Sequence, residues 1–286
     1  MLLFWLLLDK YRKGNPINPF AYCFAYFCSM TDRVHAKKRL GQHFLNSEEI
    51  AARIADSISA KEGLLMEIGP GMGALTKHLE KKWGEKLWVV EIDDESIPYI
   101  ESHFPTLKER IIHADFLALD IVSVFKDEKF SIIGNFPYNI STQILFKAID
   151  HRSQIVELVG MFQKEVAKRI CSPEGNRDYG ILSVLIQAYF NAIYLFDVPP
   201  TVFIPPPAVN SGVIKLIKKD NFSLGCNDDQ FKKVIKMAFN QRRKKLSNAL
   251  SAMLADKPIK SGLLDKRAEQ LSWKDFVNLT LLFEKA

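Results

Sequence analysis

The chain has 286 residues, of which 48% are hydrophobic and 25% charged, so it is long enough for one large domain or for a domain of roughly 200 residues plus a small one. Its net charge of +6 favours an anionic partner, which could be nucleic acid, a membrane surface or an acidic substrate. The four cysteines form no CxxC pair, so the sequence indicates neither a zinc site nor a disulfide framework and predicts a reducing compartment, the cytoplasm.

The first 29 residues differ in character from the rest of the chain. The apolar run MLLFWLLL is too short to span a bilayer, and it lacks the basic start and the small-residue cleavage site of a signal peptide. At Met30 the sequence changes abruptly to the basic stretch MTDRVHAKKRLGQHFL. We therefore predict that residues 1–29 are an extension outside the fold and that no membrane is involved; a signal anchor is the alternative.

From residue 46 onward, helical and strand patterns alternate along the chain. In chain order we expect helix 46–59, strand 64–69, helix 74–83, strand 86–92, helix 95–104, strands 110–115 and 129–135, helix 141–150, strand 155–163, helices 164–172 and 179–190, and strands 192–198 and 211–218. This order predicts an α/β fold with a mostly parallel, doubly wound sheet and an antiparallel hairpin at one edge. The pattern after about 220 is wholly helical, so we expect one domain at 30–220 and a small helical domain at 221–286.

The run EIGPGMG at 67–73 stands where the first strand of the predicted sheet turns into a helix. Gly69, Gly71 and Gly73 let the backbone approach a ligand closely, and a helix N-terminus favours negative charge. The run therefore indicates a nucleotide-type site, although a merely tight turn is the alternative. With Ala74 it also fits the dinucleotide fingerprint, so it does not separate NAD from S-adenosylmethionine (SAM).

Polar residues stand at the ends of the next three strands: Glu91, Asp115 and Asn135. Parallel strands end at one edge of the sheet, where open α/β sheets bind ligands. There Glu91 can accept hydrogen bonds from both hydroxyls of a ribose, and Asp115 can accept from an adenine amino group beside Phe116 or Leu117. The alternative for each carboxylate is a solvated strand end or a turn.

The run GNFPYN at 134–139 carries the chemistry. An adenine amino nitrogen is a poor nucleophile, because its lone pair is delocalised into the ring. The Asn135 side-chain oxygen and the Phe136 carbonyl can hold its two hydrogens and stabilise the charge that develops during attack. Pro137 keeps the turn rigid, and Tyr138 offers a face on which an extruded base can stack. This chemistry needs no metal.

The run NFPYNIST resembles the signature of the KsgA-type ribosomal RNA adenine N6-dimethyltransferases, and the resemblance extends from about Arg33 to the C-terminus. Five further stretches resemble motifs of that family in the same order: KKRLGQHFL, EIGPGMGALT, VVEIDD, HADFL, and the tract from VPPTVFIPPPAVNSGVIKL to FNQRRKKLSNAL. The resemblance implies a Rossmann-like SAM-dependent methyltransferase with a small C-terminal helical domain.

The resemblance also implies a set of site residues. Those implied to bind SAM are His43, Leu45, Gly69, Gly71, Glu91, Asp115 and Asn135. Many members carry Asn at the position of His43, and Leu45 would act through its backbone. Phe203 is either a second stacking ring for the target base or a core residue.

Two basic stretches remain. Arg33, Lys37, Lys38 and Arg39 precede the first helix, and 230–250 contains no acid while carrying Lys232, Lys233, Lys236, Arg242, Arg243, Lys244 and Lys245. A solvated helix face is the usual explanation of such a run. The length of the acid-free stretch and the implied RNA substrate favour contacts with phosphates, above all for residues 242–245.

The sequence thus predicts a monomeric enzyme that uses SAM to dimethylate N6 of two adjacent adenines near the 3′ end of small-subunit rRNA in a pre-30S particle. Alternatives within the class are a large-subunit rRNA methylase of the macrolide-resistance type and a DNA adenine methylase. A ribosome assembly factor with secondary catalysis and an NAD-dependent dehydrogenase are alternatives from other classes.

Overall fold

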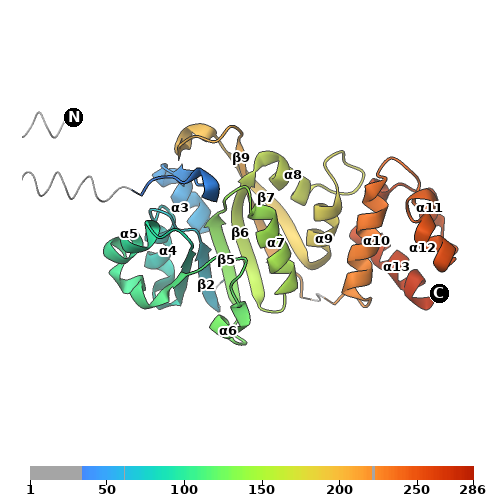
Figure 1. Cartoon of the computed structure of the whole chain (residues 1–286), viewed down its shortest axis with the longest axis horizontal. Coiled ribbons are helices and arrows are strands. Elements are labelled where there is room, and N and C mark those ends of the chain that lie inside the picture. The colour runs from blue at the N-terminus through green and yellow to red at the C-terminus, as the bar shows by residue number, and fades with distance from the viewer. Residues whose placement is uncertain (1–33, 61, 221–222) are drawn as a thin grey trace, which may run out of the picture. The chain divides into compact units, whose positions relative to one another are not determined.

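A computed structural model of the chain describes residues 34–60, 62–220 and 223–286. Its centre is a seven-stranded sheet with the strand order β4-β3-β2-β5-β6-β9-β7 (Figure 1). From β4 to β6 all neighbours are parallel, and β9 runs antiparallel to both β6 and β7. The predicted α/β fold with a mostly parallel sheet is therefore confirmed. The strands are β2 (Leu64–Ile68), β3 (Leu87–Glu91), β4 (Ile111–His113), β5 (Phe130–Asn135), β6 (Ile155–Gln163), β7 (Phe190–Val198) and β9 (Ser211–Lys218).

Side chains alternate along these strands between two hydrophobic cores, because successive residues of a strand point to opposite faces of the sheet. Ile132 belongs to the core on one face and Ile133 to the core on the other. Helices contribute to both cores, which makes the sheet doubly wound. The face of Ile133 is covered by α3 (Glu48–Ser57), α4 (Thr76–Trp83) and α5 (Ser96–His103), and the face of Ile132 by α6 (Ile121–Phe125), α7 (Ser141–Asp150), α8 (Lys164–Cys171) and α9 (Ile181–Tyr189).

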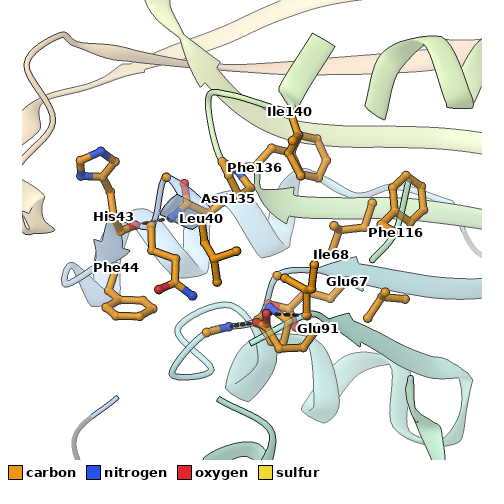
Figure 2. A pocket seen from close by; sticks show the side chains of 18 of the residues that line it. Leu40, His43, Phe44, Glu67, Ile68, Glu91, Phe116, Asn135, Phe136 and Ile140 are labelled. Carbon is orange, nitrogen blue, oxygen red and sulfur yellow. Dashed lines mark hydrogen bonds between the residues drawn. The ribbon is translucent and has the colours of Figure 1, made fainter. Parts of the chain in front are cut away.

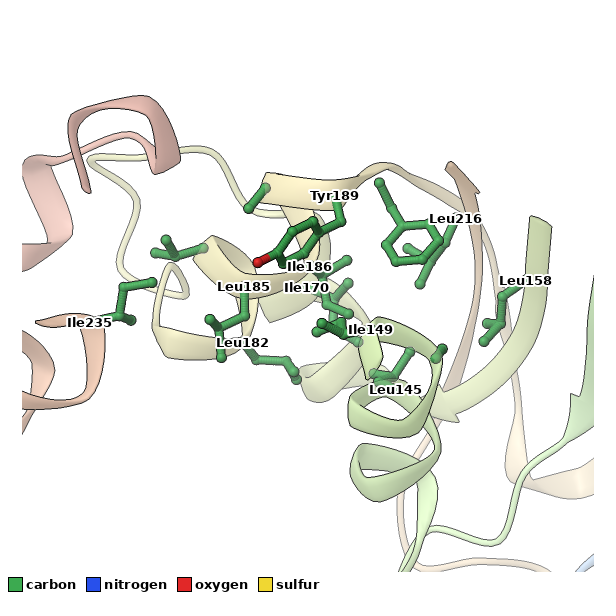
Figure 3. Close-up of a cluster of buried hydrophobic side chains, with 14 of the residues drawn as sticks. Leu145, Ile149, Leu158, Ile170, Leu182, Leu185, Ile186, Tyr189, Leu216 and Ile235 are labelled. Atoms are coloured by element: carbon green, nitrogen blue, oxygen red, sulfur yellow. The ribbon is translucent and has the colours of Figure 1, made fainter. Parts of the chain in front are cut away.

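The chain after β9 is helical, as predicted. It forms α10 (Asp228–Asn240), α11 (Leu246–Ala249), α12 (Ser251–Asp256) and α13 (Trp273–Lys285). These helices share the core of the Ile132 face, which continues from Leu158 in β6 through Leu185 in α9 to Ile235 in α10 (Figure 3). Two of these helices, α10 and α13, pack directly on α9. A separate role for 221–286 as a domain stays a prediction.

The antiparallel pair of late strands at one edge of the sheet is confirmed. The sequence did not indicate which of the two is the inner strand, and in the structure β9 lies between β6 and β7. The inner strand β9 is mostly buried, whereas the edge strand β7 has several side chains exposed to solvent. A second, two-stranded sheet pairs β1 (Phe44–Leu45) with β8 (Phe203–Ile204), and such short strands leave no periodic pattern in the sequence.

The predicted extension 1–29 lies outside the described residues. Within the described part of the chain, no helix is both long and apolar enough to cross a membrane. The same residues contain no cluster of three His, Cys, Asp or Glu side chains that could hold a metal ion.

Candidate active site

The carboxyl ends of β2, β3 and β5 and the loop after β4 open into one pocket, and the segment 39–45 forms its opposite wall (Figure 2). Open α/β sheets bind their ligands at this edge. The pocket brings together most residues that the sequence predicted for cofactor binding or catalysis, namely His43, Leu45, Gly69, Gly71, Glu91, Asp115, Asn135, Phe136, Pro137 and Tyr138.

The glycines of the loop after β2 have different surroundings. Gly69 has a φ of +68°, and a Cβ built there would meet no atom within 4 Å, so its backbone faces open space. Gly71 has a φ of +55°, and a Cβ built there would lie 2.9 Å from the Phe44 ring. At Gly73 the Phe104 ring would lie 2.3 Å away. Gly73 therefore serves side-chain packing, whereas Gly69 leaves room for a ligand against the backbone.

The Glu91 carboxylate is buried at the end of β3 and is held by backbone donors. Its Oε1 accepts from the N–H groups of Ile92 (2.8 Å) and Asp93 (2.9 Å), and its Oε2 accepts from that of Gly71 (3.2 Å). Burial raises the pKa of Glu91, although these donors favour the charged form. A carboxylate has about four lone-pair sites, so it can still accept from a ligand hydroxyl in the pocket.

Asp115 lies in the loop two residues beyond the end of β4, where its Oδ1 accepts from the N–H of Leu117 (2.9 Å). The loop is fixed from α7 by Lys147, whose ammonium donates to the carbonyls of Leu117 (3.0 Å) and Leu119 and lies 5.2 Å from the centre of the Phe116 ring. The sequence did not single out Lys147, because its targets lie about thirty residues away in the chain.

Asn135 ends β5 with its side chain in a defined orientation. Its Nδ2 donates to the backbone carbonyl of His43 (2.8 Å). This bond turns the side-chain oxygen of Asn135 away from His43, and that oxygen has no hydrogen-bond partner among the described residues. An oriented, unused amide acceptor at the edge of a ligand pocket suits the recognition of an N–H group.

These features agree with the comparisons to known proteins. The family model for ribosomal RNA adenine dimethylases matches residues 33–285. The chain belongs to the ribosomal RNA adenine dimethylase family. It is 51% identical to the ribosomal RNA small subunit methyltransferase A of Flavobacterium johnsoniae over 255 residues, which are 88% of this chain and 97% of the relative. The protein of the same name from Cytophaga hutchinsonii is 52% identical over 254 residues, 87% of this chain and 97% of the relative.

Solved structures share the fold of this dimethylase. A dimethyladenosine transferase from Plasmodium falciparum has a TM-score of 0.72 at 25% identity, covering 85% of this chain and 98% of that one. The 23S rRNA methyltransferase ErmE has a TM-score of 0.58 at 22% identity, covering 82% and 98%, and this likeness concerns the fold alone. The predicted Rossmann-like methyltransferase fold is confirmed, and the family uses SAM as its methyl donor.

Phe136 explains why a glycine precedes the site asparagine of this dimethylase. Its buried ring folds back over β5 and β6 and packs edge-on against Phe162, with 5.4 Å between the ring centres. Gly134 and Gly160 are paired across these strands, and a Cβ on either would lie 2.6 or 2.2 Å from the Phe136 ring. The ring is thus part of the core beside the pocket that Phe136 helps to line.

Gly160→Ala should therefore destabilise the protein. The added methyl group collides with the Phe136 ring, and overpacking of this kind costs about 1–3 kcal/mol. We expect a lower midpoint in chemical denaturation, together with weaker methyl transfer because the turn after Asn135 shifts. Gly175→Ala serves as the comparison. A Cβ added at this loop glycine meets no atom within 4 Å, so any strain in that variant comes from its φ of +81° alone. An unchanged midpoint for Gly160→Ala would contradict this packing.

The aromatic rings of Tyr138 and His43 lie beside Asn135 and contact residues at the entrance of the pocket. Tyr138 is half-buried, its hydroxyl hydrogen-bonds to Ser211 Oγ (2.6 Å), and its ring centre lies 5.7 Å from that of His43. The His43 ring contacts the carbonyl of Pro205 through Nδ1 (2.8 Å), so its side chain braces the mouth while its backbone orients Asn135. Phe203 is 3% exposed and packs in the core beside Leu45, outside the pocket lining, which favours the core alternative for that residue.

The four cations at 242–245 have different surroundings. Arg242 is paired with Glu269 (2.7 Å) and donates to the carbonyl of Arg177 (2.6 Å), so it joins the loop before α9 to the C-terminal helices. Lys245 is exposed and lies 3.1 Å from Asp265. Arg243 and Lys244 are exposed, and their side chains have no partner in the described part of the chain. Only the last two are fully available to an anionic ligand.

Glu67 is a buried carboxyl of this pocket to which the sequence assigned no role. It accepts from the hydroxyl of Thr76 (2.8 Å), and burial raises its pKa to about 8. A signal was present in the sequence, because Glu67 opens the run EIGPGMG and lies two residues before Gly69.

Proposed function

We propose that this chain transfers methyl groups from SAM to N6 of two adjacent adenines near the 3′ end of small-subunit rRNA, giving N6,N6-dimethyladenosines in a pre-30S particle during ribosome biogenesis. The observation that carries the proposal is the oriented acceptor oxygen of Asn135 in one pocket with the open backbone at Gly69 and the buried carboxylate of Glu91. The names of the relatives that are about half identical to the chain support the small-subunit substrate.

The pocket residues fit a nucleoside cofactor. Glu91 would accept from the ribose hydroxyls, Asp115 would accept from the adenine amino group beside the Phe116 ring, and the open backbone at Gly69 would lie against the cofactor. His43 and Leu45 would contribute through their backbones from the facing wall. When bound, SAM supplies an electrophilic methyl group.

The residues of this chain would contribute by positioning the target amino group and by stabilising the charge that develops on it during methyl transfer. In the first transfer the Asn135 oxygen and the Phe136 carbonyl would hold the two hydrogens of the target amino group, which localises its lone pair and stabilises the positive charge that develops on nitrogen. The methylated nitrogen would then release one proton to water, and one of the two acceptors would hold the remaining hydrogen in the second transfer. Pro137 would keep these two acceptors at a fixed spacing, and the Tyr138 ring would stack against the extruded base. No covalent intermediate with the protein is needed.

Methyl transfer from labelled SAM to immature small subunits tests this function. We expect the label in N6,N6-dimethyladenosine at two adjacent positions near the 3′ end of the rRNA. Label in large-subunit rRNA, or in naked rRNA alone, would contradict the proposed substrate and favour the related large-subunit activity. The same proposal includes that the protein is a monomer and acts in the cytoplasm. Sedimentation of the purified chain tests whether it is monomeric.

The basic surface gives a separate prediction. If Arg243 and Lys244 neutralise phosphates, the Arg243→Ala/Lys244→Ala variant should bind RNA with a flatter salt dependence, by up to about one slope unit per lost contact. Backbone contacts carry no sequence information, so the variant should still modify the same adenines. The test is RNA affinity measured across a salt series. Equal slopes of affinity against salt concentration for the variant and the wild type would show that these two residues do not contact phosphates.

Arg242→Ala is the informative comparison, because its guanidinium is already engaged with Glu269 and the Arg177 carbonyl. Its loss should lower the stability of the loop before α9 rather than flatten the salt dependence.

A further inference from the structure

The segment 37–45 performs two tasks in the pocket. Its residues 39–45 form one wall of the pocket, and the backbone carbonyl of His43 orients the Asn135 amide. A short segment with one 3-10 turn and a two-residue strand does not hold its own position, so contacts with the rest of the fold must fix it.

One buried carboxylate binds the start and the middle of this segment. The Lys37 ammonium forms an ion pair with Asp93 Oδ1, and Gln42 Nε2 donates to Asp93 Oδ2 (2.9 Å). The Lys37 N–H also donates to Gln42 Oε1 (2.8 Å), which closes the network. The Asp93 side chain is 0% exposed and that of Lys37 is 21% exposed.

Asp93 is also joined to the cofactor side of the pocket, because its N–H donates to the carboxylate of Glu91 (2.9 Å). Although burial opposes its charge, the hydrogen bonds from Gln42 and Lys37 keep the pKa of Asp93 below its ordinary value. The carboxylate is therefore charged at neutral pH, and charge-assisted hydrogen bonds are the strong ones.

We propose that Lys37, Gln42 and Asp93 form a clasp that positions the segment 37–45 over the cofactor pocket and, through the His43 carbonyl, holds Asn135 in its reactive orientation. The three are positioning residues. The part of this inference that concerns Asn135 rests on the proposed function, whereas the effect on cofactor binding does not involve RNA.

The clasp assigns Lys37 a role different from that of its basic neighbours. From the sequence, Lys37 and Lys38 are equivalent candidates for phosphate contacts. In the structure the Lys37 ammonium pairs with Asp93 and lies 3.1 Å from a Glu95 carboxylate oxygen. Lys38 is exposed, and its side chain has no partner within the described residues. The pair thus offers matched variants that remove the same charge one residue apart.

The test compares Lys37→Met and Lys38→Met in the full chain. SAM affinity is measured by calorimetry without RNA, and kcat is measured at saturating SAM with immature small subunits. We expect Lys37→Met to weaken SAM binding and to lower kcat, each by about tenfold, because a charge-assisted contact of the pocket wall is lost. Lys38→Met should leave SAM affinity unchanged. Lys37→Arg keeps the charge and should restore most of both losses.

Gln42→Ala combined with Lys37→Met should cost less than the sum of the single changes, because both act through Asp93. The clasp is refuted if Lys37→Met leaves SAM affinity and kcat at the wild-type values. It is also refuted if that variant only flattens the salt dependence of RNA binding, as a phosphate contact would. If wild type failed to methylate small subunits, the proposed substrate would be wrong, while the SAM affinities would still decide the clasp.

Discussion

Asn135→Ala should lower methyl transfer to immature small subunits by roughly a thousandfold, the size of effect seen when one preorganised transition-state partner is removed. The acceptor oxygen for the target amino group disappears, while the basic surface around Arg243 and Lys244 is untouched. We therefore expect unchanged RNA affinity, and single-turnover kinetics with filter binding of the same particles would show both results.

Asn135→Asp is the matched control for this effect. It keeps an acceptor oxygen but loses the Nδ2 donor to the His43 carbonyl, so the side chain is no longer held in one orientation. We expect activity between that of Asn135→Ala and wild type. Turnover of Asn135→Ala at the wild-type rate would rule out the proposed mechanism, whichever result the Asp variant shows.

Glu91→Gln should weaken SAM binding by about a hundredfold, because two ribose hydroxyls lose a charged acceptor and each such bond is worth about 1.5–3 kcal/mol. Glutamine has nearly the same size and keeps one oxygen for the N–H groups of Ile92 and Asp93, so the loop after β3 should stay folded. Calorimetry without RNA measures the change, and an unaltered SAM affinity would remove Glu91 from the cofactor site.

The pH dependence of SAM binding supplies a second readout for Glu91. Burial raises the pKa of this carboxyl, so it takes up a proton at a higher pH than an ordinary glutamate does. SAM affinity of the wild type should therefore fall as the pH is lowered from neutral to mildly acidic, because the charged acceptor is lost. Glu91→Gln cannot titrate there and should show a flatter profile.

Much of the site was predictable because its determinants are local. The apolar, β-branched runs before Glu91 and Asn135 specify strands, and parallel strands end at one edge. Asp115 reached the same pocket although its strand ends two residues earlier than expected, because the loop continues past that edge. The run GNFPYN indicated the chemistry of its own residues, since the backbone of a turn depends on its proline and glycine.

Side-chain environment was less predictable, because it depends on partners that are distant in sequence. Lys37 and Lys38 look alike in the sequence, yet only Lys37 lies against a carboxylate 56 residues further on. Arg242 and Arg243 are neighbours of the same charge, and only Arg242 reaches Glu269, 27 residues away. Packing of the folded chain decides which cation is engaged and which is left for phosphate.

The doubly wound sheet, the helical C-terminal part and the family were predictable from the sequence, because periodicity and contiguous motifs are properties of neighbouring residues. The tertiary structure alone decided that β9 lies between β6 and β7, that Phe203 packs in the core, and that the His43 carbonyl turns the Asn135 amide. Each of these depends on burial and hydrogen bonding between segments far apart in the chain, which no local pattern encodes.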